Sequence, residues 1–229
     1  MIDLIVILLL VFTVLLFVGR FFLTRFVAKA NNLDNVFTNK FPSEIFKAKE
    51  GPIYFNKVIN YIYVGISFGG IFIILPNIKS FGGVEVFSII VSSVAGLVGL
   101  LGIINAEISV FYVKQHILIS TIFMAGNFLL SALVGVNSYL YYQMGQTTKA
   151  SGGSIMSIVF AVLAALVAVT SLIIMFNPKL KDWAKLVRIS ENDNSFVRPK
   201  YFPLAFSEWL FNLIHFLSLL IFILSIMTM

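Results

Sequence analysis

Six stretches of about 20 apolar residues, separated by polar loops, limit what this chain can fold into. A helix that crosses the roughly 30 Å hydrocarbon core of a bilayer needs about that length. The composition agrees, because 59% of the residues are hydrophobic and only 11% are charged, against about 25% charged residues in a soluble domain. The mean hydropathy is +1.00. The sequence therefore predicts an all-α, polytopic membrane protein with a bundle of six transmembrane helices.

The predicted helices form one integral membrane domain that covers residues 1–229. Gly and Pro residues interrupt the apolar pattern in the loops between them. The first stretch lacks the basic n-region of a signal peptide, so we interpret it as a helix that is retained. The six segments lie near Leu4–Phe22, Val58–Leu75, Val86–Asn105, Ile117–Ser138, Ser154–Phe176 and Leu204–Met227.

The distribution of basic residues predicts how the bundle is oriented. Of the sixteen Lys and Arg residues, all but Lys79 and Lys149 fall in the loops that would share one side of the membrane. Cytoplasmic loops are the ones enriched in Lys and Arg, so we expect a multi-pass protein of the cell membrane with both termini outside. The positive net charge of +6 does not require nucleic acid, because these residues fringe membrane helices and face anionic headgroups. The expected partners are membrane lipids and other membrane proteins, and no nucleic acid.

The last cytoplasmic loop has the pattern of a short amphipathic helix. Apolar and basic residues alternate over Leu180–Arg188 at helical spacing, which predicts a helix that lies flat on the inner leaflet. A loop without regular structure is the alternative for this stretch.

Small residues predict which helices pack in the centre, because membrane helices associate through close backbone contact. Gly, Ser and Ala recur in the second, third and fifth segments, and small residues are scarce in the first and sixth. We therefore expect the second to fifth segments to form the core, and the first and sixth to face lipid.

Polar side chains inside the second, fourth and sixth predicted helices follow the 3.6-residue helical period. An ionisable residue in hydrocarbon costs about 2.5–3.5 kcal/mol and usually faces a partner or water. These three helices enter the membrane from the same side, so their polar faces can converge in a pocket open to the cytoplasm. In the alternative, His215 only bonds a neighbouring hydroxyl or carbonyl, and Glu208 lies at headgroup level. The candidates for the pocket and its mouth are Glu208, Asn212, His215, His116, Ser120, Asn60, Tyr63, Ser67 and Glu107.

Two stretches carry a resemblance to a known group. Gly99–Glu107 leads to His116 at the start of the fourth helix, and Ser207-Glu208-Trp209 opens the sixth. Together with the six-helix pattern, these features resemble the DRAM/Sfk-like group of six-helix membrane proteins and related uncharacterised prokaryotic families. The resemblance implies lipid-related membrane biology, such as trafficking or lipid-anchor remodelling, without an established chemistry.

Motifs of enzymes are missing from the sequence, which has no cysteine, no HExxH, no P-loop and no GxSxG. We therefore expect no catalytic residue, no metal site and no cofactor. The leading interpretation is a non-enzymatic, lipid-associated assembly or trafficking factor. A small transporter or channel that uses Glu208 and His215 is one alternative. A membrane-embedded metal hydrolase that acts on lipids is another, with a haem-binding subunit less compatible with the unequal depths of His116 and His215.

Overall fold

The computed structural model describes residues 2–46, 61–62, 84–109, 112–148, 155–180, 187–190, 193–197 and 200–227. Five helices in these parts are long and apolar enough to cross a membrane, consistent with a helical, multi-pass membrane protein. The second predicted segment, near Val58–Leu75, lies outside the described residues apart from Tyr61 and Ile62. The five helices are α1 (Ile2–Ala30), α6 (Val84–Glu107), α7 (Val113–Thr148), α8 (Ile155–Met175) and α9 (Pro203–Met227).

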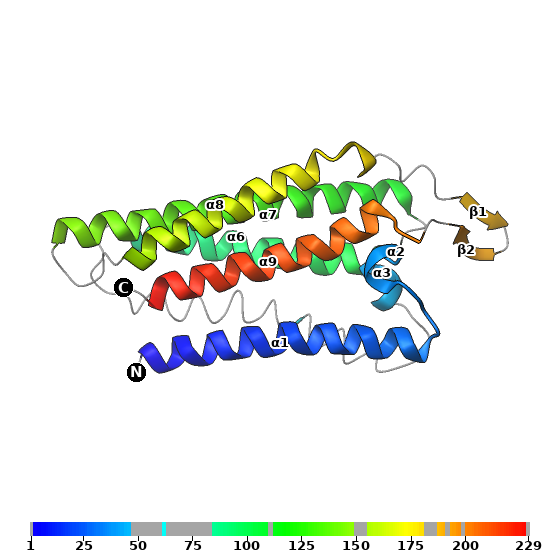
Figure 1. The fold of residues 1–229 in the computed structure, drawn as a ribbon, viewed down its shortest axis with the longest axis horizontal. Helices are drawn as coiled ribbons and strands as arrows, with labels where there is room; N and C mark the ends of the chain where they lie inside the picture. Colours follow the sequence, from blue (N-terminus) through cyan, green and yellow to red (C-terminus); the bar gives the residue numbers. More distant parts are fainter. Residues whose placement is uncertain are drawn as a thin grey trace.

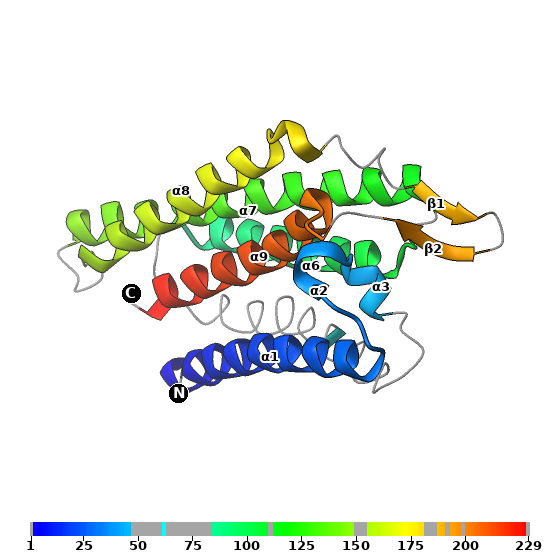
Figure 2. The same ribbon diagram turned by 45° about the vertical axis from the view of Figure 1, so that its right-hand side comes forward.

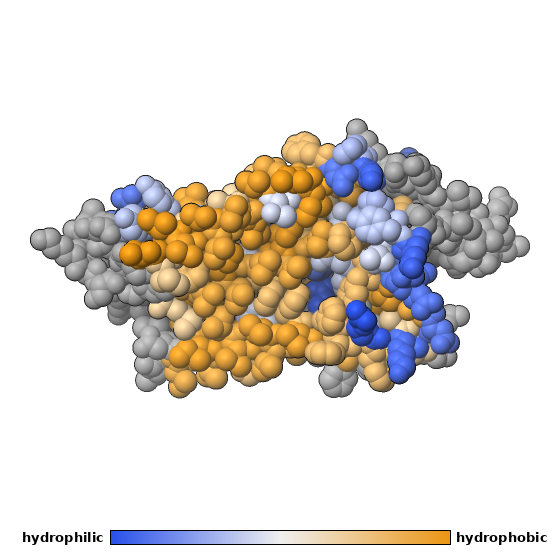
Figure 3. Space-filling model, in the orientation of Figure 1, coloured by the Kyte–Doolittle hydropathy of each residue, from blue (hydrophilic) through white to orange (hydrophobic). Residues whose placement is uncertain are grey.

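The long helices run side by side along the long axis of the molecule (Figures 1 and 2). Both termini lie at one end. The short helices α2 (Val36–Asn39) and α3 (Pro42–Phe46) and a β-hairpin lie at the other end. Hydrophobic side chains cover the sides of the bundle, and hydrophilic ones gather around α2 and α3 (Figure 3). We call this the basic end, since the described Lys and Arg residues that the sequence assigns to the cytoplasm, apart from Arg20 within α1, lie in or near its helix ends and loops.

Helix α9 is the most buried of the five long helices, contrary to the prediction that the first and sixth segments face lipid. In its most apolar stretch of 18 residues, 61% of the residues are buried, against 17% in the corresponding stretch of α1 and 22% in that of α8. It packs against α1, α6, α7 and α8. Large side chains such as Phe211 and Phe222 fill the centre, each 0% exposed. The prediction was right for α1 and wrong for α9. It failed for α9 because large side chains fill the space between helices there, so that a central helix does not need small residues.

Small residues allow close helix contacts at more than one place, between α6 and α7 and between α7 and α8. An added Cβ at Gly135 would lie 3.4 Å from the carbonyl oxygen of Ala161 and 3.5 Å from Cβ of Ala164. The two backbones are therefore close at this level, as small residues allow. Helix α8 otherwise lies at the periphery, so its Ala-rich sequence does not mark a central helix.

The loop before α9 forms a β-hairpin where the sequence predicted the end of an interfacial helix. Strand β1 (Val187–Ser190) pairs antiparallel with β2 (Asp193–Val197), with Val187 opposite Val197. The helix prediction is wrong at Val187 and Arg188. The β-branched residues of Val187–Ile189 favour a strand, and a partner strand with Phe and Val is available close by in the sequence.

A short segment between α1 and α3 folds back over the basic end of the bundle. Helix α1 ends where Asn32 adopts a positive φ of 52°, and Asn35 does the same (φ 53°) before α2. Asn accepts this left-handed conformation more readily than most residues. The start of α3 is closed by Glu44, whose Oε2 accepts a hydrogen bond of 2.7 Å from the backbone N–H of Phe41. We call residues 31–46 the cap segment.

Candidate functional site

Three helices bring four polar side chains together near the basic end, and we call them the polar cluster: Asn105, His116, Ser120 and Glu208. Oε1 of Glu208 lies 2.6 Å from the Ser120 hydroxyl and 2.9 Å from Nε2 of His116. The other ring nitrogen of His116 lies 3.1 Å from the backbone carbonyl oxygen of Ile108. All four side chains are buried, and Glu208 is 0% exposed. The carboxyl group of α9 is thus tied to two residues of α7.

Counting protons shows that the polar cluster can exist in more than one state. The Ser120 hydroxyl lies within hydrogen-bond distance of both Glu208 Oε1, at 2.6 Å, and Asn105 Oδ1, at 2.8 Å. A hydroxyl has only one proton to donate. Either Glu208 carries a proton and donates it, or the Asn105 amide group turns so that its nitrogen donates to Ser120. The hydrogen bonds that Glu208 makes are therefore coupled to the orientation of the Asn105 amide group.

The cap segment covers the polar cluster, whereas the polar faces of the helices predicted an open pocket. The ring of Phe41 meets His116 edge to face, with 5.0 Å between ring centroids. Phe41 is itself 1% exposed. The segment is fastened to α9, because Trp209 Nε1 donates a 2.8 Å hydrogen bond to the carbonyl oxygen of Lys40. On another side, a cavity of about 200 Å³ between α7, α8 and α9 is bordered by Ser120.

The structure separates the remaining predicted residues from this cluster. His215 is buried about two turns further along α9 than Glu208, roughly 10 Å along the axis. Asn212 donates from Nδ2 to the Glu208 carbonyl oxygen at 2.7 Å and faces α1. Glu107 is half-buried at the end of α6. Asn60, Tyr63 and Ser67 lie outside the described residues.

Sequence reasoning missed Asn105, which ends the third predicted segment and supplies an acceptor to Ser120. Its position beside Glu107 and near His116 in the sequence was the available signal. Other buried polar contacts lie further from the basic end: Ser131 and Ser218 join α7 to α9 at 2.8 Å, and Ser88 donates to Asn137 at 2.9 Å. These pairs connect helices without an ionisable group, so we assign them a structural role.

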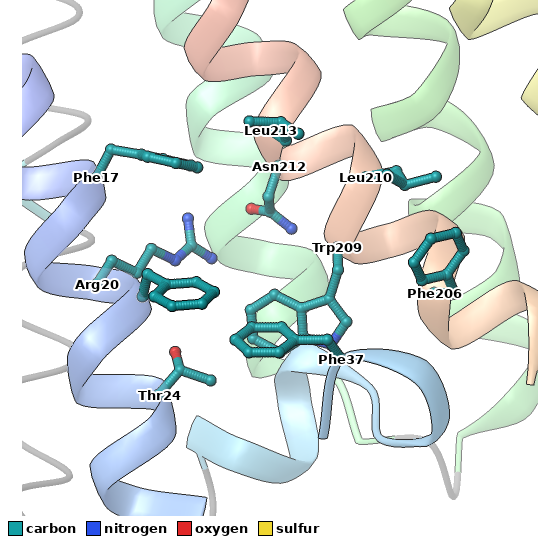
Figure 4. Close-up of a pocket in the computed structure, with 10 residues that line it drawn as sticks. Phe17, Arg20, Thr24, Phe37, Phe206, Trp209, Leu210, Asn212 and Leu213 are labelled. Carbon is teal, nitrogen blue, oxygen red and sulfur yellow. The ribbon is translucent and has the colours of Figure 1, made fainter. Parts of the chain in front are cut away.

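A groove runs between α1 and α9, closed at the basic end by α2 (Figure 4). Its volume is about 300 Å³. Aromatic and aliphatic side chains form most of its walls, and we call it the α1–α9 groove. The lining residues are Phe17, Arg20, Phe21, Thr24, Phe37, Phe206, Trp209, Leu210, Asn212 and Leu213.

A few polar side chains interrupt the apolar walls of the groove. Arg20 extends from α1 across the groove towards Asn212 on α9 (Figure 4). Thr24 lies one helical turn closer to the basic end and is 0% exposed. Its hydroxyl has no hydrogen-bond partner in the described parts of the chain. The groove thus combines apolar walls with a cation and a buried hydroxyl group, the combination found in sites that orient an amphipathic ligand.

The polar cluster and the groove are linked through neighbouring residues of α9. Glu208 belongs to the cluster, and the next residue, Trp209, forms part of the groove wall. Phe37 of the cap segment packs edge to face on Trp209 and stacks on Phe21 of α1, with 5.0 Å between centroids in both pairs. The cluster therefore fixes the end of α9 that, together with the cap segment, shapes one end of the groove.

The described residues contain no group of three or more His, Cys, Asp or Glu side chains placed to hold a metal ion. No protein-family model, curated protein or solved structure matches the chain. The geometry of the groove and of the polar cluster is therefore the basis for a function.

Proposed function

We propose that this chain is a non-enzymatic, six-helix membrane protein that binds a membrane lipid in the α1–α9 groove. The observation that supports lipid binding is the groove itself. It is apolar along most of its length and opens on the side of two helices long enough to span a bilayer. A hydrocarbon chain can enter such a groove from the bilayer without crossing water. At about 300 Å³ the groove is at the small end of ligand sites, so it holds part of a lipid while the rest stays in the bilayer.

The count of six helices is supported by the positions of the chain ends. Helix α1 begins and α9 ends at the same end of the bundle (Figure 1). A chain that starts and finishes on one side must cross an even number of times. Five described spans therefore call for one further crossing, and the apolar segment near Val58–Leu75 is the candidate. In this proposal the basic end faces the cytoplasm, as the distribution of Lys and Arg predicts.

Membership of the DRAM/Sfk-like group is part of the proposal. The resemblance rests partly on His116 and on Glu208, which are far apart in the sequence. Their contact at 2.9 Å gives both residues a common structural role, because it joins the start of α7 to the start of α9. A lipid-associated assembly or trafficking role is compatible with this arrangement, in which the buried pair keeps the cap segment and groove in shape.

A second candidate function, a small proton-coupled transporter, is favoured by one observation. Oε2 of Glu208 is buried and has no hydrogen-bond partner in the described parts of the chain. Buried carboxyl groups of membrane helices commonly serve as proton sites. Proteoliposomes that contain a pH-sensitive dye test this candidate. Proton flux that Glu208→Gln abolishes would favour transport over lipid binding alone.

Lipid retention in mild detergent tests the main proposal. Leu213→Trp should fill the end of the groove that lies away from the cap segment. It should therefore lower the amount of lipid that native mass spectrometry detects on the purified protein. Leu166→Trp is the matched control, because Leu166 is 57% exposed on the outer side of α8 and borders no part of the groove. Equal lipid retention by both variants, at the level of the wild type, would contradict the proposal.

A further inference from the structure

We propose that the lipid bound in the α1–α9 groove is an anionic phospholipid whose phosphate is held by Arg20 and Thr24. This inference rests on the lipid-binding function proposed above and adds the class of headgroup. The acyl chain would lie between Phe17 and Leu213, towards the middle of the bilayer. The phosphate would lie nearer to the basic end, where α1 carries its charged residues.

Arg20 supplies the charge for this site. Its guanidinium group lies inside the groove, between α1 and α9, with Phe17 of its own helix above it in the view of Figure 4. A guanidinium group presents a planar fork of N–H donors that matches two phosphate oxygens. Basic pockets between membrane helices on the cytoplasmic side are a recognised kind of site for acidic headgroups.

Thr24 is the second, independent observation that points to a ligand. Its side chain lines the groove one turn from Arg20, and its hydroxyl points towards Arg20 (Figure 4). The hydroxyl is buried and has no hydrogen-bond partner among the described residues. A buried hydroxyl without a partner costs free energy, roughly 1–3 kcal/mol. A phosphate oxygen of a ligand in the groove would accept this hydrogen bond after a small outward shift of the walls.

The rim of the groove continues the positive charge outward. The guanidinium carbon of Arg25 lies 5.4 Å from the centroid of Phe21 and 5.6 Å from that of Phe37. These contacts hold the charge beside the mouth of the groove. A wider surface hollow of about 680 Å³ adjoins it, since Phe37 lines both, and two basic residues, Arg25 and Lys29, border that hollow together with the acidic Asp34. A headgroup attached to the phosphate can extend into this space.

The occupant is a lipid rather than a protein segment or a second copy of the chain. The groove is narrow, with a volume of about 300 Å³, and the side chains of Arg20 and Thr24 lie nearer to the basic end than those of Phe17 and Leu213 (Figure 4). This order of apolar and cationic parts along the membrane normal matches the order of acyl chain and phosphate in a phospholipid. A protein helix on this face would present apolar side chains to the groove along its whole length and place them against the guanidinium group of Arg20.

Native mass spectrometry of the full chain, released from nanodiscs with equal amounts of phosphatidylglycerol and phosphatidylcholine of identical acyl chains, tests the inference. We expect wild-type protein to retain phosphatidylglycerol preferentially. Arg20→Gln should lower the amount of phosphatidylglycerol retained about tenfold or more, the effect of losing one charge-assisted hydrogen bond. Thr24→Val, which keeps the shape and removes the hydroxyl, should lower it several-fold. Lys114→Gln is the control, because it removes one exposed charge at the same end without touching the groove.

The outcomes separate the two proposals. Equal retention of both lipids by the wild type would overturn the headgroup inference and leave lipid binding intact. Retention of neither lipid would overturn both. An equal loss of retained phosphatidylglycerol in Lys114→Gln and Arg20→Gln would show that the charge of the basic end acts at a distance, with no phosphate site in the groove. Dimers that form in place of lipid adducts would assign the groove to a second copy of the chain.

Discussion

Replacing Glu208 by Met tests whether the polar cluster holds the basic end together. Met keeps the length of the side chain and removes both carboxyl oxygens. The substitution breaks the 2.9 Å contact with His116 and the 2.6 Å hydrogen bond from Ser120. His116 is 2% exposed, so water cannot replace the lost partner without opening the cap segment.

The expected loss in the free energy of unfolding depends on which buried polar groups lose their partner. Interhelical hydrogen bonds between membrane helices contribute about 0.6 kcal/mol each on average, so two of them account for about 1 kcal/mol. Removing one partner of a buried pair costs more, about 3–5 kcal/mol, because the other group stays buried without compensation. We expect Glu208→Met to lower the free energy of unfolding by about 3–5 kcal/mol. Adding His116→Leu should recover most of this loss, because apolar replacement of a whole buried pair is often neutral.

Unfolding in mixed micelles with increasing sodium dodecyl sulfate provides the assay. The chain has two tryptophans, so the Trp183→Phe background leaves Trp209, which is bonded to the cap segment, as the only indole reporter. The free energy of unfolding is compared for each single variant, for the double variant and for the background protein. Additive losses, or a loss below about 1 kcal/mol in Glu208→Met, would refute the view that the two residues act as a buried pair.

Three further predictions follow from the packing, the cap segment and the orientation of the chain. Gly126→Ala should lower the thermal stability in detergent, since its Cβ would lie 2.9 Å from the branched side chain of Val98, whereas Gly135→Ala, with its nearest contact at 3.4 Å, should be close to neutral. Trp209→Phe should cost about 1 kcal/mol through the lost hydrogen bond to Lys40 and should increase hydrogen exchange in the cap segment, and an unchanged exchange rate would count against the attachment of that segment. Single cysteines placed at Ser80, Ser151 and Ser195 test the orientation. In intact cells a membrane-impermeant maleimide should label the first two, which are expected outside, and should not label the cysteine at Ser195, which is expected inside. Labelling at Ser195 alone would reverse the orientation.

The positions of the helices could be predicted from the sequence because hydrocarbon thickness sets their length. Five predicted segments agree with described helices to within a few residues, apart from extensions at the ends of α1 and α7. The central place of α9 could not be predicted from small residues, since its core contacts are made by large rings such as Phe211. The hairpin was missed because a helical wheel over Leu180–Arg188 accommodates the same apolar residues that pair as strands.

The polar cluster was partly predictable, and the groove was not. Helical spacing and the membrane cost of ionisable groups selected Glu208 and His215 as residues in need of partners, and the polar stripe of the fourth predicted helix supplied His116 as one partner. The sequence could not show that Asn212 faces α1, away from Glu208 and His116, because residues four apart on a helix point in similar but not identical directions. The groove depends on Phe37 and Trp209, whose contact requires the cap segment to fold back onto α9. That fold depends on Asn32 and Asn35 in left-handed conformations, a local signal that hydropathy does not carry.

Photo-crosslinking gives the most direct test of lipid binding in the α1–α9 groove. Phosphatidylglycerol with a diazirine in its acyl chain is incorporated into nanodiscs with the full chain, irradiated, and its adducts are located by peptide mass spectrometry. The account predicts that adducts concentrate on the facing sides of α1 and α9, at the level of Phe17 and Leu213, and that Leu213→Trp reduces them while Leu166→Trp does not. Adducts spread evenly over the exposed faces of α6, α7 and α8, with no excess at the groove, would contradict it.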